Sequence, residues 1–146
     1  MPPRSRWGLT PRQSIEQECV RRGQDAVVAG CARLIVAEEA DPGLLVALGG
    51  PAAEKFLDGR THQDTYWLRV WGARGLLWAW DDTALDAVKV ALVDEAWRVR
   101  EMAVKVVARH LLGDLLPEVA ELRADPVPRV RAAATRAVAV LTESGA

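Results

Sequence analysis

A recurrence of residue types every 31 positions is the feature that most constrains the fold of this 146-residue chain. When the sequence is shifted by 31 residues along itself, an apolar residue followed by Arg coincides three times. The coinciding pairs are Leu68-Arg69, Val99-Arg100 and Val130-Arg131. Repeats of this length are single supersecondary units that cannot bury their apolar faces alone. The chain is therefore predicted to be a stack of such units.

Helix start and stop signals divide the chain into segments whose apolar residues follow a 3.6-residue period. Thr10-Pro11 and Asp41-Pro42 are typical of helix starts, Asp25 is expected to cap the second helix, and Gly59 is typical of a helix end. The predicted helices cover residues 11–22, 25–39, 42–49, 51–58, 66–80, 81–93, 97–112, 114–124 and 129–141. No segment alternates with the period of a strand, so the fold class is all-α.

The repeat and the helix boundaries together predict one folded domain. Residues 1–10 are expected to form an N-terminal tail, and residues 11–146 a single repeat domain. Within that domain, two or three helices over 11–50 are expected to cap the stack. Three units of paired helices follow, at 51–80, 81–112 and 113–142. The first unit is the weakest copy, because Gln63 stands where the others have Asp94 and Asp125.

Two segments carry a resemblance to a known family. Asp94-Glu-Ala-Trp-Arg-Val-Arg100 and Asp125-Pro-Val-Pro-Arg-Val-Arg131 each place a turn Asp six residues before a helical Arg. This pattern resembles the HEAT repeats, particularly their short bacterial form of about thirty residues. The resemblance implies a right-handed α-α solenoid of helical hairpins. It also implies a binding scaffold rather than an enzyme.

The repeated Asp and Arg residues have a structural interpretation. In stacked repeats, a turn carboxylate can cap the following helix and also accept hydrogen bonds from an Arg of the adjacent unit. We therefore expect a structural ladder. Its members are Asp94, Asp125, Arg69, Arg100 and Arg131. Ligand binding through these residues is the alternative.

One flank of each second helix remains as a candidate partner-binding surface once the core and the ladder are assigned. At three equivalent positions of the helical wheel this flank carries basic residues and tryptophans. They are Trp67, Arg74 and Trp78, then Arg98, Lys105 and Arg109, then Arg129 and Arg136, while the last position of the third set is Val140. Arg and Trp are enriched in binding hot spots, which favours the docking of an acidic protein segment. A nucleic-acid backbone is the second candidate partner, and a merely solvated flank is the plain alternative.

Several other residues have ordinary interpretations. His110 falls on the apolar stripe of the helix at 97–112 and is expected to be a hydrogen-bonded core histidine. Trp71 is expected to pack in the core. His62 lies near Asp58 and Asp64 at a spacing that matches no standard metal site, so no metal is predicted.

Composition and motifs argue against several function classes. The formal net charge is −1, so no strong whole-molecule field attracts nucleic acid or an anionic membrane. No apolar run approaches the roughly 18 residues that span a bilayer, and the first residues lack the apolar segment of a signal peptide. Cys19 and Cys31 are expected to be reduced thiols, with a disulfide as the alternative. We therefore expect a cytoplasmic protein that does not bind membranes.

No motif for catalysis or for a cofactor stands out. The sequence contains no nucleophile elbow and no phosphate-binding loop, and Gly49-Gly50-Pro51 has the pattern of a helix break. An enzyme of the phycobilin-lyase type is the catalytic alternative, because the short repeats are similar to those of that family. No residue marks a chromophore site, and we predict neither catalysis nor a cofactor.

Overall fold

The computed structural model describes residues 8–144, and within that range the chain forms helices and no strand. The α-helices are α1 (Pro11–Arg22), α2 (Gln24–Ala37), α3 (Pro42–Gly49), α4 (Tyr66–Gly75), α5 (Leu85–Ala91), α6 (Trp97–His110), α7 (Leu116–Glu121) and α8 (Pro128–Glu143). Short 3-10 helices lie between them at η1 (Gly50–Leu57), η2 (Asp82–Ala84), η3 (Gly113–Leu115) and η4 (Leu122–Ala124). The all-α fold class is confirmed. Most of the expected tail at 1–10 lies outside the described residues.

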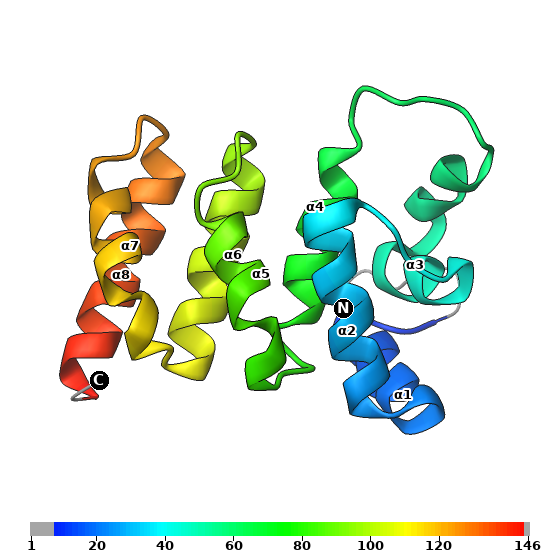
Figure 1. Ribbon diagram of the computed structural model, residues 1–146, viewed down its shortest axis with the longest axis horizontal. Helices are drawn as coiled ribbons and strands as arrows, with labels where there is room; N and C mark the ends of the chain where they lie inside the picture. The colour runs from blue at the N-terminus through cyan, green and yellow to red at the C-terminus, as the bar shows by residue number, and fades with distance from the viewer. Residues whose placement is uncertain (1–7, 145–146) are drawn as a thin grey trace.

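The helices form a solenoid. In Figure 1 they stand side by side along the longest axis, with α8 and the C-terminus at one end and α1 and α3 at the other. The second helices α4, α6 and α8 pack in succession, while α5 and α7 pack on α6 and α8 respectively. Buried side chains from α1 through α8 join into one continuous core. Stacking has therefore buried the apolar faces that single units leave open.

The segment before α4 differs from the expected helix at residues 51–58. It is the 3-10 helix η1, which packs against α3, while the main helical neighbour of α4 is α2. The close approach of α4 to α2 depends on glycine. A Cβ at Gly72 would lie 2.7 Å from the carbonyl oxygen of Cys31, and one at Gly75 would lie 2.5 Å from its Sγ. Gly72 and Gly75 thus allow α4 to pack closely on α2, although the contacting residues lie more than thirty positions apart in the sequence.

The helix expected over 66–80 ends early, at Gly75. The residues that follow remain packed, with Leu76 and Ala79 fully buried. Their carbonyl groups are used by the next unit, because Arg109 Nε donates to the oxygen of Leu77 at 2.7 Å and His110 Nε2 lies 2.7 Å from that of Leu76. Side chains of α6 therefore hydrogen-bond to carbonyl oxygens that, in a longer α4, would accept hydrogen bonds from the backbone of the same helix.

Two of the predicted helix caps are confirmed and one is wrong. Thr10 and Gln13 form a reciprocal capping box at the start of α1, with bonds of 3.2 and 3.0 Å. Asp41 accepts from the backbone N–H of Leu44 at 3.1 Å and caps α3. Asp25 lies in the first turn of α2, because Gly23 is the capping residue there.

Candidate functional site

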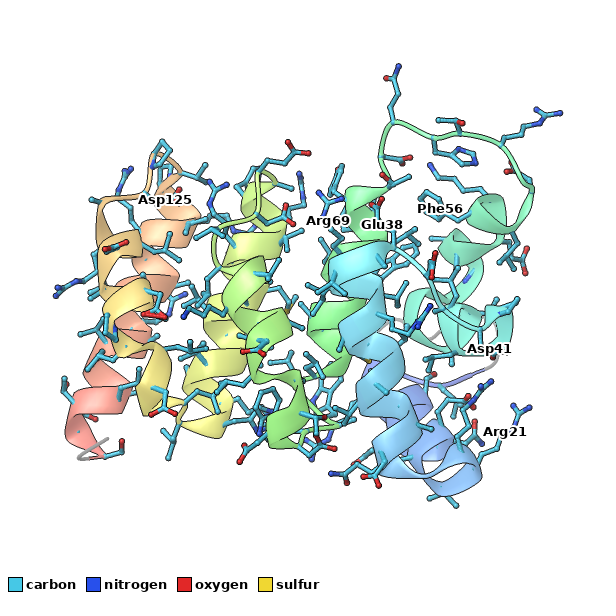
Figure 2. All side chains as sticks on the ribbon, viewed as in Figure 1. Arg21, Glu38, Asp41, Phe56, Arg69 and Asp125 are labelled. Atoms are coloured by element: carbon cyan, nitrogen blue, oxygen red, sulfur yellow. The ribbon has the colours of Figure 1, made fainter. Side chains whose placement is uncertain are left out.

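Ion pairs between consecutive units run along one edge of the stack. Arg69 binds Asp94 through Nε at 2.8 Å and Nη2 at 3.1 Å. Arg100 binds Asp125 with the same atoms and the same two distances. Arg69 also donates through Nη1 to Glu38 at 2.7 Å. Figure 2 shows Asp125, Arg69 and Glu38 along this common edge.

Each of these aspartates also holds the turn that precedes a second helix. Oδ1 of Asp94 accepts from the N–H of Ala96, and Oδ1 of Asp125 from that of Val127, both at 2.8 Å. Burial alone would raise the pKa of Asp125, but the hydrogen bonds from Arg100 and Val127 outweigh it, and the pKa is lowered. These carboxylates are already occupied, so they have little capacity left for a ligand.

Arg131 occupies the equivalent position in the last described unit. Its Nη1 donates to the carbonyl oxygens of Asp125 and Pro126 at 2.8 and 3.2 Å, as that of Arg100 does to Asp94 and Glu95. Within residues 8–144 no further unit offers it a turn aspartate. The side chain of Arg131 is exposed.

The predicted flank has three rows, each made of one equivalent position from each predicted second helix. The row of Trp67, Arg98 and Arg129 is continuous in space. The guanidinium of Arg98 lies 5.5 Å from the ring centre of Trp67 and 4.4 Å from that of Trp97. Arg129 lies 5.3 Å from the same Trp97 ring and donates to Glu101 at 3.0 Å. We call these alternating side chains the Trp/Arg row. Cation–π contacts hold the planar groups in place while Arg98 and Arg129 remain exposed.

The other two rows are less uniform than the wheel suggests. Lys105 and Arg136 are exposed and make no ion pair with residues 8–144. Arg74, their counterpart in α4, is instead half-buried and donates through Nη2 to the carbonyl oxygen of Leu48. Trp78 is also half-buried, while Arg109 is exposed and bonded to Leu77. We use the name basic face for the Trp/Arg row together with Lys105, Arg109 and Arg136.

A hollow of about 430 Å³ adjoins the Trp67 end of the basic face. Its lining comes from the end of α3, from η1, from the loop after it and from α4. The lining residues are Gly49, Ala52, Lys55, Phe56, Asp64, Trp67, Trp71 and Arg74. Sequence reasoning did not identify this site. The spacing of Trp67, Trp71 and Arg74 on one side of α4 was visible, but nothing local links them to Phe56.

The unit geometry and a comparison with a family model agree on the type of repeat. The model of the HEAT repeat family matches residues 115–145, which include α7, η4 and all of α8. This match over one unit supports a HEAT-like repeat protein. Comparisons with curated proteins and with solved structures gave no match. HEAT repeats commonly mediate protein interactions, so the match suggests a protein-interaction scaffold in general.

The other aromatic and histidine side chains that were considered in the sequence either pack against or hydrogen-bond to neighbouring residues. Trp71 is buried, as expected, and His110 is half-buried with its ring 4.9 Å from that of Trp80. His62 lies 3.0 Å from Asp58. No cluster of three or more potential metal ligands occurs within residues 8–144.

Cys19 and Cys31 are both unpaired, and burial raises the pKa of Cys31 to about 12. Among the described helices of the HEAT-like chain, none has the length and apolar character needed to cross a membrane.

Proposed function

We propose that this HEAT-like chain is a non-catalytic scaffold that binds an acidic segment of a protein partner through its basic face. The chain as a whole is almost neutral, with a formal net charge of −1. The basic face nevertheless carries five cationic side chains, and its one buried carboxylate, Glu101, is already paired with Arg129. Charge complementarity therefore favours an acidic partner.

The Trp/Arg row is the observation that carries this proposal. Exposed Arg side chains normally lose rotamer freedom when they bind a partner, which costs about 0.5–1.5 kcal/mol each. Arg98 lies between two indole rings and Arg129 against one, so part of this cost has already been met on folding. Preorganised Arg and Trp side chains are the residues expected at a binding hot spot.

A pair of matched variants tests the face. Lys105→Glu with Arg136→Glu reverses two charges on it, while Lys89→Glu with Arg123→Glu makes the same change at exposed positions of α5 and η4. We expect partner proteins to be retained by the wild-type and control chains in affinity chromatography and lost from the test variant. Equal retention by all three chains would refute the face as the binding site.

Nucleic-acid binding is the second candidate, supported by the unpaired Lys105 and Arg136. With about four phosphate contacts, the affinity for a 20-base-pair duplex should fall about 150-fold between 50 and 200 mM salt. Fluorescence anisotropy of a labelled duplex measures this directly. A chain that does not bind the duplex at 50 mM salt would eliminate this candidate.

We also propose a cytoplasmic location. The two unpaired thiols are the supporting observation, since oxidising compartments favour disulfides.

A further inference from the structure

We infer that the hollow beside Trp67 captures the C-terminal residue of the partner chain, with its apolar side chain between the aromatic walls and its α-carboxylate on Arg74. This inference rests on the proposed function, since it requires the partner to be a protein. It adds a chemical requirement that the basic face alone does not impose, namely a free chain end.

The walls of the hollow are aromatic and fixed by packing. The ring of Phe56 lies 5.7 Å from that of Trp71, edge to face, and the ring of Trp67 lies 6.4 Å from that of Trp71, nearly parallel. Gly49 allows Trp71 to come close, because a Cβ there would lie 2.7 Å from the indole. A preformed hollow of about 430 Å³ is within the usual size range of ligand sites. Such walls favour an apolar or aromatic side chain.

Arg74 is a cation that has no carboxylate partner among residues 8–144. Its Nη2 donates to the carbonyl oxygen of Leu48, and its Nε is buried without a hydrogen-bond partner. By contrast, the ladder residues Arg69 and Arg100 each bind an aspartate through two hydrogen bonds. Burial lowers the pKa of Arg74, which reflects the cost of keeping this charge away from water. A carboxylate that binds here would repay part of that cost.

The other charges in the hollow do not oppose an anion. Lys55 is paired with Asp64, so these two lining groups balance one another. Arg74 then leaves the hollow with one excess positive charge. A single carboxylate matches it, and the planar guanidinium is suited to carboxylate geometry.

The position of the hollow favours a chain end over a small molecule. Small ligands usually have most of their surface buried, whereas Ala52 and Lys55 at this site are exposed. Trp67 belongs both to the hollow and to the Trp/Arg row, where it contacts Arg98. A chain whose last residue enters the hollow can therefore continue along the basic face. Capture of a C-terminal carboxylate is an established mode of peptide recognition.

Two dye-labelled peptides test the inference on the full-length chain. Both contain ten residues, mostly Glu and Asp, and end in Phe, but one has a free carboxylate and the other an amide. In fluorescence anisotropy we expect the free acid to bind at least about tenfold more tightly, as for loss of one charged hydrogen-bonded contact. This comparison needs no change in the protein, so it cannot fail through misfolding.

Two protein variants then separate the hollow from the face. Ala52→Trp fills the hollow from an exposed position and should reduce binding of the free acid to the level of the amide. Lys105→Glu with Arg136→Glu should weaken both peptides. Equal affinity of acid and amide for the wild type overturns the inference, and the proposed function survives if the face variant still weakens both. If neither peptide binds the wild type, both the inference and the proposed acidic partner are overturned.

Discussion

Arg100 and Arg131 provide an internal comparison that measures what the inter-unit ion pair contributes to stability. Both donate Nη1 to two carbonyl oxygens of their own turn, at the same distances of 2.8 and 3.2 Å. Only Arg100 also holds the carboxylate of Asp125. Replacing each Arg by Ala therefore removes the same local contacts, and the difference between the two variants reports the ladder.

The size of the effect follows from burial. The side chains of Arg100 and Asp125 are 13% and 3% exposed, so Arg100→Ala leaves a buried carboxylate with one backbone donor. Breaking a buried ion pair in this way costs about 3–5 kcal/mol. Arg131→Ala removes one partly buried and one exposed hydrogen bond to carbonyl oxygens, with a net cost of about 0.5–1.5 kcal/mol. We expect the two variants to differ by about 2–4 kcal/mol.

Urea unfolding followed by circular dichroism and tryptophan fluorescence measures these free energies. At about 2–4 °C per kcal/mol for a chain of this size, the two thermal midpoints should differ by roughly 10 °C. A double-mutant cycle of Arg100→Ala and Asp125→Ala should give a coupling energy of at least about 2 kcal/mol. If Arg100→Ala and Arg131→Ala destabilise the chain equally, within about 0.5 kcal/mol, the ladder does not stabilise the fold as argued.

Three further outcomes are expected. Gly72→Ala should destabilise the chain by about 1–2 kcal/mol in urea unfolding, because overpacking against a backbone oxygen costs more than the roughly 1 kcal/mol gained in helix propensity; Ala132→Gly, at an exposed site of α8, measures that propensity gain alone. The lowered pKa of Asp125 gives stability that is complete above its unfolded value of about 3.9 and lost as the pH falls through the folded value, so Asp125→Asn should flatten the dependence of the urea midpoint on pH below about pH 4. At pH 8, Cys31 should not react with a thiol reagent in the folded chain, because burial raises its pKa to about 12, while half-buried Cys19 reacts slowly; rapid reaction of two thiols before unfolding would contradict the buried placement.

Local signals predicted the helices well where a cap or a breaker is present. Thr10 and Asp41 start α1 and α3 as expected, because their side chains bond to backbone groups within the same turn. α4 ends five residues before its predicted end, since the carbonyl groups of Leu76 and Leu77, just after the helix, bond to side chains of α6. Such bonds connect residues more than thirty positions apart and leave no local pattern.

The strict 31-residue period predicts the repeat, the helical class and the alignment of Trp67, Arg98 and Arg129, because it brings equivalent side chains of stacked helices into line. It does not predict that Trp97 lies between Arg98 and Arg129. Only the packing of the folded chain takes Arg74 out of the exposed row and makes α2 the neighbour of α4. It also brings Phe56 and Lys55 together with Trp67 and Trp71 around one hollow. These outcomes depend on the close packing of α2, α3 and η1 around α4, and no periodicity relates these three elements to α4.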